Sequence, residues 1–514
     1  MNNKTKFFLL FLIFALSIAR FVYLGSVPGI NNDEALYGIK TCIMMHKPFT
    51  LIGFNSYTGP IISYLRLPFY YFMGVNIFLL RFPVVILNLI AIFYAYKILK
   101  ETYNNLTGII GALLLLSMPW SFMYSRFADE TQTTLILFAI CGLYYLNTNK
   151  KISSRVLAAL FLGMGVFNHM IFIIVPISYF IYFLIGNGAR PDLSPGFLGR
   201  NTEPRLQSGR MYKFKCKLNR ANFLFLIIFF SFLLFRVSLI VKYHFFGAEG
   251  SGIYYNISEA INKNIIPKFI SLIPHFLNML DGSAFFEKAT GRILFYVLPF
   301  NSFLFVASFL FLIFRYKYNP EFKYKDRMFV SIFILNYLIC AVFLMRFSFK
   351  YFLVTLMFAT ILMAIFIGTS NIRNSIRVFC ISFVVISNCS YNWYDYIYSF
   401  KQKGGRVNYF LAGNFIENSS DFVDSKILYD YLKTKDIKNI LVPGYAPRFQ
   451  LIFLDLKEKR LNIWARPENV SSGKFYFISY KGDGLPEAYG ISKNYTINKE
   501  DTSLNNFQIF LLQK

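Results

Sequence analysis

The sequence predicts an all-α polytopic membrane protein with about eleven transmembrane helices, followed by a small exoplasmic α/β domain. Hydrophobic residues make up 56% of the 514 positions, charged residues only 15%, and the mean hydropathy is +0.46. Soluble globular chains carry about 25% charged residues. The apolar residues form runs long enough to cross a hydrocarbon layer about 30 Å thick. Basic residues stand mostly between these runs, as expected where loops fix the orientation of helices.

The composition excludes several other classes of protein. The 62 Phe and 36 Tyr argue against disorder, and six scattered Cys argue against a disulfide scaffold. The 53 Lys+Arg and 26 Asp+Glu give a net charge of +27, which in a soluble protein would suggest nucleic acid as a partner. Because these charges lie between apolar runs, we expect an anionic membrane surface as their partner and no nucleic acid.

The first apolar run predicts an uncleaved membrane helix. Lys4 and Lys6 precede an apolar stretch at residues 7–27 that is interrupted only by Arg20. No A-x-A-like cleavage site closes a short apolar region, so the run is typical of a first transmembrane helix rather than of a signal peptide. The N-terminus is therefore expected on the cytoplasmic side.

Further apolar runs of suitable length follow. They lie at residues 78–99, 106–124, 131–147, 156–186 (two short spans around Asn168-His169), 222–241, 293–314, 328–345, 351–368 and 376–393. With this count, the basic loops near residues 97–100, 150–155, 187–221, 315–327 and 373–377 all fall on the cytoplasmic side, as the positive-inside rule requires. Treating 156–186 as a single helix would move the basic 187–221 loop outside, which the rule disfavours.

The same orientation predicts four exoplasmic segments: residues 28–77, 126–130, 242–292 and everything after about residue 395. We divide the chain into a transmembrane catalytic domain at 1–394 and a small exoplasmic domain at 395–514. In the latter, a helix-like stretch at 424–435 precedes K-N-I-L-V-P at 438–443, which predicts an α/β unit. The 242–292 loop has no metal-ligand spacing and is interpreted as surface helix and loop, with the option of a lid.

Two acidic pairs at helix ends are candidate catalytic residues. Asp33 and Glu34 follow the first helix in N-N-D-E-A-L-Y, and Asp129 and Glu130 occupy the turn S-R-F-A-D-E-T. Neighbouring carboxylates at a membrane surface are functional candidates. The alternative is structural, since Asn32 or Asp33 could cap a short helix and a tight turn needs polar residues. Arg126 beside the second pair is suited to a phosphate.

Other polar residues are expected on the same face. His169 lies between two short spans, where it could bind substrate or simply pack. Arg346 and Lys350 stand at an exoplasmic helix junction in M-R-F-S-F-K-Y-F, where they could bind an anionic substrate or extend to the interface. No P-loop, GxGxxG, CxxC or G-x-S-x-G element occurs, which argues against nucleotide hydrolysis within this chain.

The N-terminal third resembles a known superfamily. The succession A-R-F-V-Y-L-G-S-V-P-G-I-N-N-D-E-A-L-Y-G, Y-T-G-P-I-I-S-Y-L-R-L-P-F-Y-Y-F-M-G, L-R-F-P-V-V-I-L-N-L and M-P-W-S-F-M-Y-S-R-F-A-D-E resembles the GT-C superfamily of membrane glycosyltransferases. Within it, the resemblance is to the protein-mannosyltransferase and aminoarabinose-transferase-like branch, including the bacterial lipopolysaccharide-core galacturonosyltransferase type. It covers about residues 15–185.

This resemblance implies a transferase that uses a sugar on a polyprenyl phosphate at the exoplasmic membrane face. It implies that Asp33 is the catalytic carboxylate with Glu34 beside it, and that Asp129 or Glu130 is a second acidic position. Arg126 matches a recurring Arg. Lys350-Tyr351 matches a late R-Y motif that contacts the lipid phosphate, although Lys replaces Arg and the usual downstream Pro is missing.

A mechanism follows from these residue types. Asp33 would act as the base for the acceptor hydroxyl, a step with a typical gain of about 10²–10⁴, and the cations would stabilise the phosphate leaving group. By analogy with the family we expect inversion. No cofactor is certain, although Asp33 with Asp129 or Glu130 could hold a divalent cation. The expected partners are the lipid-linked sugar, membrane lipids and a glycan, lipid or protein acceptor, at a prokaryotic plasma membrane.

Two other functions stay open from the sequence. A flippase or transporter of lipid-linked sugars needs polar residues along the middle of its helices, whereas most ionisable residues here are at helix ends. A catalytically inactive relative that acts as a scaffold is the other alternative.

Overall fold

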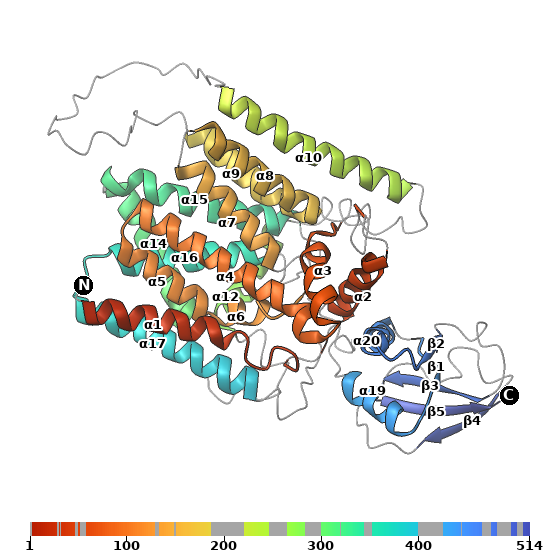
Figure 1. Cartoon of the computed structure of the whole chain (residues 1–514). Helices are drawn as coiled ribbons and strands as arrows, with labels where there is room; N and C mark the ends of the chain where they lie inside the picture. The colour runs from red at the N-terminus through yellow and green to blue at the C-terminus, as the bar shows by residue number, and fades with distance from the viewer. Residues whose placement is uncertain are drawn as a thin grey trace.

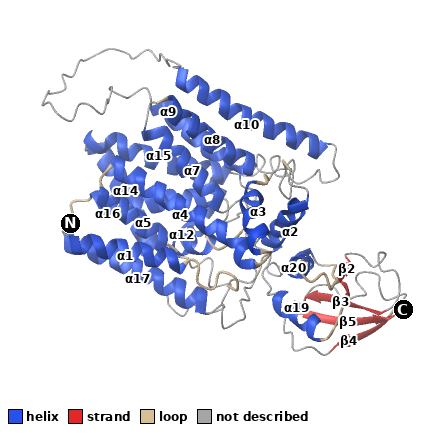
Figure 2. Ribbon diagram, viewed as in Figure 1, coloured by secondary structure: helices blue, strands red, loops and turns tan. Residues whose placement is uncertain are grey.

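The computed structural model describes residues 3–27, 30, 32–46, 50–51, 58–128, 133–148, 151–186, 220–245, 265–282, 300–318, 320–343, 352–398, 425–443, 445–464, 474–480, 495–500 and 507–513. Within these ranges the chain forms a large helical region and a small sheet near the C-terminus (Figure 1). Figure 2 shows that the strands lie together in the C-terminal part. The predicted combination of a mostly helical region with a small C-terminal part that contains a sheet is therefore confirmed.

Helices occupy the predicted apolar spans. They are α1 (Asn3–Ala19), α4 (Ile77–Thr102), α5 (Asn105–Ser117), α6 (Pro119–Tyr124), α7 (Thr133–Thr148), α8 (Ile152–Asn168), α9 (Ile174–Gly186), α10 (Arg220–Phe245), α14 (Phe300–Tyr318), α15 (Pro320–Phe343), α16 (Leu353–Thr369) and α17 (Asn374–Ser390). Among the described residues, two stretches, 77–102 and 222–242, are long and apolar enough to cross a membrane, and seven other apolar helices have 10–17 residues. The figure of about eleven crossings stays a prediction.

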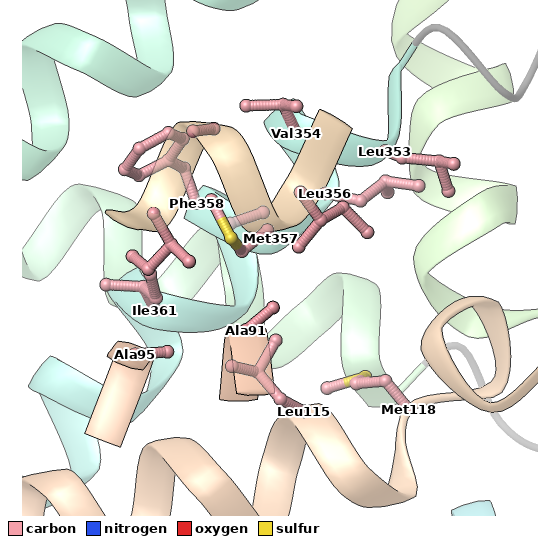
Figure 3. Close-up of a cluster of buried hydrophobic side chains, with 14 of the residues drawn as sticks. Ala91, Ala95, Leu115, Met118, Leu353, Val354, Leu356, Met357, Phe358 and Ile361 are labelled. Carbon is pink, nitrogen blue, oxygen red and sulfur yellow. The ribbon is translucent and has the colours of Figure 1, made fainter. Parts of the chain in front are cut away.

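The core of the helical region lies where α4, α5 and α16 meet. Figure 3 shows Ala91 and Ala95 of α4 and Leu115 of α5 facing Leu356 and Met357 of α16. All five side chains are at most 3% exposed. The two alanines let neighbouring helices approach α4 closely. Close packing of this kind holds helices together in lipid, where the hydrophobic effect does not drive their association.

The predicted span at 106–124 is broken, and this corrects the expectation of one continuous helix. Pro119 has no N–H, so it cannot bond the carbonyl of Leu115 four positions earlier. Arg20 at the end of α1 replaces it and donates from Nη2 to the Leu115 carbonyl over 3.0 Å. Asn392 donates to the carbonyl of Ser117, the last residue of α5, over 2.7 Å. The break is thus stabilised by side chains that follow the first helix, α1, and the last helix of the helical region, α17.

The predicted pair of short spans at 156–186 is present. α8 ends at Asn168, His169 is extended, and the 3₁₀ helix η1 (Met170–Ile173) leads into α9. The loop at 242–292 contains α12 (Ile265–Asp281), and its remaining parts at 246–264 and 283–292 lie outside the described residues. After α17 the chain continues as the π-helix η4 (Tyr391–Tyr398).

Two shorter helices occupy the segment between α1 and α4. They are α2 (Asn32–His46) and α3 (Ile61–Met73). α3 ends in three exposed residues, Tyr71, Phe72 and Met73, of which Phe72 is 88% exposed. Aromatic side chains of this kind favour the boundary between lipid and water. α3 is therefore suited to lie in the membrane interface rather than across the bilayer.

The C-terminal part is a mixed sheet with two helices. Its elements are α19 (Ser425–Thr434), β1 (Asn439–Leu441), α20 (Tyr445–Asp455), β2 (Asn462–Trp464), β3 (Lys474–Tyr480), β4 (Thr496–Glu500) and β5 (Phe507–Gln513). The strand order is β2-β1-β3-β5-β4, with β1 parallel to β2 and β3, and the other pairs antiparallel. The predicted helix at 424–435 and strand at 438–443 correspond to α19 and β1.

The C-terminal part packs on the helical region through α20. In Figure 1, α20 lies next to α2. Phe453 of α20 joins the buried cluster formed by Ala35 and Tyr37 of α2 with Tyr70 of α3. Its ring lies so close to Gly38 that a Cβ there would come within 2.3 Å of it. The helix that carries the first acidic pair is therefore held between the membrane region and the C-terminal sheet.

Candidate functional site

The first acidic pair lies in the first turn of α2. The helix begins at Asn32, so Asp33 and Glu34 are placed where the N-terminal N–H groups and the helix dipole favour negative charge. Successive side chains on a helix point about 100° apart. Asp33 is partly exposed, whereas Glu34 is fully buried. The two neighbouring carboxylates therefore have different surroundings.

Glu34 is held in a buried ion pair with Arg81 of α4. Arg81 Nε lies 2.8 Å from Glu34 Oε1, and Nη2 lies 2.6 Å from Oε2. The backbone N–H of Ala128 also donates to Oε1 over 2.8 Å. Ala128 directly precedes Asp129 in the chain, so Glu34 joins the first acidic pair to the segment that leads into the second. These contacts favour a positioning role for Glu34.

Arg126 uses its guanidinium on backbone carbonyls. Nη1 donates to Arg20 over 2.8 Å and Nη2 donates to Val27 over 2.8 Å, and the side chain is fully buried. These bonds tie the end of α6 to the stretch after α1. A contact between Arg126 and a phosphate stays a prediction.

The Asn168-His169 turn is bonded to the segment before α3. Gly59 N–H donates to the Asn168 carbonyl over 2.6 Å, and Thr58 pairs with His169 as an isolated bridge. His169 Nδ1 accepts from Ile171 N–H over 3.1 Å, which caps η1. The observed bond of the His169 side chain is thus structural, and its predicted contact with substrate stays a prediction.

The remaining predicted site residues lie outside the described residues. These are Asp129, Glu130, Arg346, Lys350 and Tyr351. Among the side chains that the structure does describe, no three His, Cys, Asp or Glu residues gather as metal ligands. A divalent cation bound by Asp33 with Asp129 or Glu130 therefore stays a prediction.

A further candidate, Arg236 of α10, was missed by the sequence reasoning. Its side chain is fully buried, and none of its three guanidinium nitrogens has a hydrogen-bond partner among the residues that the structure describes. The guanidinium carbon lies 5.6 Å from the centre of the Phe167 ring. An isolated cation removed from water is costly, and inside a membrane such a residue is a functional candidate by default.

The other fully buried arginines in the described part of the chain all form hydrogen bonds, unlike Arg236. Arg20, Arg66, Arg81 and Arg126 each donate to backbone carbonyls, and Arg81 also pairs with Glu34. Each of these four side chains therefore has a structural use for its charge. Arg236 has no such use, which favours an anionic ligand as its partner.

Arg236 and Asp33 face a common region. Tyr37 of α2 lies within electrostatic range of Arg236, and Tyr37 follows Asp33 by four positions, which places both on one side of the helix. Phe167, which lies under the guanidinium, directly precedes the Asn168-His169 turn. The arrangement places a partly exposed carboxylate and a cation that has no hydrogen-bond partner in the described ranges near Tyr37 and the end of α8.

Comparison with protein families identifies one matching segment. Residues 58–195 match the family described as dolichyl-phosphate-mannose-protein mannosyltransferase. The match starts between α2 and α3 and includes α4 to α9, together with Arg81, Arg126 and His169. Among curated proteins, no sequence matches the chain significantly.

Solved structures match over nearly the whole chain. ArnT from Cupriavidus metallidurans in the apo state has a TM-score of 0.55 at 12% identity, over 99% of this chain and 98% of that one. The same protein bound to undecaprenyl phosphate gives 0.54 at 12% identity, over 98% and 97%. The apo oligosaccharyltransferase of Archaeoglobus fulgidus gives 0.47 at 14% identity, over 93% and 70%. The ArnT matches extend through both the helical region and the C-terminal sheet.

Proposed function

This chain has the fold of the GT-C superfamily of membrane glycosyltransferases, and we propose that it transfers a sugar from a polyprenyl-phosphate donor to an acceptor hydroxyl. The reaction takes place at the exoplasmic face of a plasma membrane, with the N-terminus cytoplasmic and the C-terminal domain exoplasmic. The match to a protein solved with undecaprenyl phosphate supports a lipid-phosphate donor. The alternation of basic loops along the sequence supports the orientation.

The observation that carries the proposal is that Asp33 lies on the same side of α2 as Tyr37, and that Tyr37 is within electrostatic range of Arg236. The acceptor oxygen attacks the anomeric carbon while its proton passes to the Asp33 carboxylate. The bond between the anomeric carbon and the phosphate oxygen breaks, and its electron pair stays on the lipid phosphate. Arg236 stabilises that charge, because a fixed cation in an apolar site is more effective than one in water.

A single displacement of this kind inverts the configuration at the anomeric carbon. Glu34 joins the start of α2 to the segment before Asp129 through its bond with Ala128. Arg346, Lys350 and Tyr351 remain predicted contacts of the phosphate. The acceptor is a glycan, a lipid or a protein, since each offers a hydroxyl group.

The proposal is tested by offering membranes that contain the protein a panel of polyprenyl-phosphate sugars, each radiolabelled in the sugar, with an envelope extract as the source of acceptor. We expect one donor to be consumed and its label to appear in an acceptor fraction. Membranes without the protein are the control. Transport of a labelled donor across vesicles without any transfer would instead support a flippase, and no consumption of any donor would contradict the proposal.

Replacing Arg236 by leucine is expected to increase stability and to weaken binding of the donor. Removing a buried charge that bonds none of the described residues is expected to raise the free energy of unfolding, because an unpaired charge is costly to bury. The same change removes a charge-assisted bond to the donor phosphate, which is worth about 1.5–3 kcal/mol, so donor affinity should fall about 10- to 100-fold. Thermal unfolding in detergent and the KM for the lipid-linked sugar measure the two effects.

Arg20→Leu is the matched control for that experiment. Arg20 is equally buried, but its guanidinium bonds Asn88 and the carbonyls of Leu115 and Leu116. Its loss leaves buried acceptors unsatisfied at about 1–3 kcal/mol each, so this variant should be less stable than the wild type. If Arg236→Leu also lost stability and kept its donor affinity, the assignment of Arg236 to the phosphate would be wrong.

A further inference from the structure

A cleft separates the C-terminal domain from the helical region on the side away from α10. Its volume is about 620 Å³, within the range of about 300–1,000 Å³ that is typical of ligand pockets. None of the candidate catalytic or phosphate-binding residues lines it. Its lining comes from both parts of the molecule, which meet where Figure 1 shows α20 next to α2.

The floor of the cleft is mostly apolar and belongs to the membrane region. It is formed by Gly25 after α1, Met73 at the end of α3, Val75, and Ile77 to Leu79 at the start of α4, with the N-cap residue Asn76 as its polar member. Met73 is 65% exposed and Phe78 is 38% exposed. Because α3 is suited to the membrane interface, these side chains are placed to contact acyl chains of the outer leaflet.

The roof of the cleft combines the apolar side chains of Phe453 and Leu454 with two lysines and one glutamate. Lys426 and Tyr429 of α19, together with Lys457 and Glu458 just after α20, face the floor. Glu458 is paired with Lys433 at 2.6 Å, and this hydrogen bond lowers the pKa of the Glu458 carboxyl. Lys426 is paired with Asp430. Lys457 forms no ion pair with any residue that the structure describes.

The surroundings of Lys457 are basic. Residues 425–464 without 444 contain eight Lys and Arg against four Asp and Glu, a net charge of +4. A basic surface next to exposed apolar side chains at a membrane boundary attracts anionic lipid, at about 1 kcal/mol for each Lys or Arg close to the headgroups. The cleft thus combines the two features that a lipid with an anionic headgroup requires.

We propose that this cleft binds the anionic headgroup of an outer-leaflet lipid between Lys457 and Lys426, with the acyl chains along Met73 and Phe78. The bound lipid bridges the C-terminal domain and the α3–α4 turn. It fixes the distance between the domain and the membrane surface, and hence the position of α20 against α2. The site is separate from the transfer site, so it stands or falls independently of the proposed transferase activity.

The test uses the full-length protein, purified in detergent and freed of lipid, and needs neither sugar donor nor acceptor. Phosphatidylglycerol and phosphatidylcholine with the same acyl chains are titrated, and the bound lipid is counted by native mass spectrometry. We expect phosphatidylglycerol to bind more tightly than phosphatidylcholine. Lys426→Gln/Lys457→Gln should weaken its binding about fivefold for each lysine removed.

Lys435→Gln/Lys438→Gln is the matched control, since it removes the same charge from the same domain at positions that do not line the cleft. Equal binding of phosphatidylglycerol by the two double variants would overturn the proposal. So would equal affinity for both lipids in the wild type. Inorganic phosphate that binds as tightly as phosphatidylglycerol would also overturn it, because the apolar floor would then play no part.

A steric variant tests the floor without changing charge. The three atoms nearest to a Cβ at Gly25 belong to Phe78, at 3.5–3.9 Å, which is ordinary van der Waals contact. Gly25→Leu is therefore expected to fold normally and to displace the lipid by filling the floor. Unfolding measurements check the first expectation, and unchanged lipid binding in a folded Gly25→Leu variant would contradict the proposed position of the lipid.

Discussion

Asp33→Asn is expected to lower kcat by about 10²–10⁴-fold, because the acceptor hydroxyl loses the base that takes its proton. Folding should change little. Asparagine has the same shape, it is accepted at the start of a helix, and the lost charge is worth about 0.3–1 kcal/mol at a helix N-terminus. The measurement is the initial rate of sugar transfer at saturating donor, together with the midpoint of thermal unfolding.

Asp436→Asn is the control for Asp33→Asn. It makes the same chemical change at a side chain that is 73% exposed in the C-terminal domain, where Asp436 is paired with Lys438 and Arg460. Exposed pairs contribute little to stability, so both rate and stability should stay close to those of the wild type. The Asp33→Asn variant should still bind the lipid-linked donor, since Arg236 remains. A variant that kept more than about a tenth of the wild-type rate would rule out Asp33 as the base, given the usual size of such contributions.

Glu34→Gln is expected to lower the free energy of unfolding by about 3–5 kcal/mol, because Arg81 is left as a buried charge without its partner. The glutamine oxygen can still accept from Ala128 N–H, so the loss comes mainly from the broken ion pair. If Glu34 only positions the site, the variant should have a lower kcat and an unchanged pH profile. A shift of the acidic limb of that profile would instead assign the proton transfer to Glu34.

The double variant Glu34→Leu/Arg81→Met provides the control. Replacing both members of a buried pair by apolar residues of similar size is often neutral or stabilising, so stability should return toward that of the wild type. Activity should not return, since Ala128 N–H has then lost its acceptor and the segment before Asp129 is no longer held by α2. Recovery of full activity in this variant would exclude a positioning role for Glu34.

The sequence predicted the order of elements well, because the relevant signals are local. Apolar runs predict helices, and the alternation of basic loops predicts their orientation. The polar Asn168-His169 pair marked the turn between α8 and α9. The break at Pro119 was missed because residues on both sides are apolar. The hydrogen bonds that satisfy the carbonyls left free at the break come from Arg20 and Asn392, which are far away in the chain.

The candidate site was only partly predictable, for a different reason. Which of Asp33 and Glu34 is buried depends on how α2 is rotated against α4, and no local pattern reports that rotation. The bonds from Arg126 to the carbonyls of Arg20 and Val27 could not be read from the sequence, and its contact with a phosphate stays a prediction. Arg236 was overlooked inside a run whose average hydropathy is 2.7. A charged residue within such a run was the signal that could have revealed it.

The bond between Arg20 and the Leu115 carbonyl joins groups that are 95 positions apart. During synthesis, α1 enters the bilayer with its guanidinium long before the acceptors of that charge leave the ribosome. A cation without partners is costly in lipid, so α1 can adopt its final position only after α5 and α6 have been inserted. The first helix to be made is thus among the later ones to dock, and the order of assembly in this third of the protein differs from the order of translation.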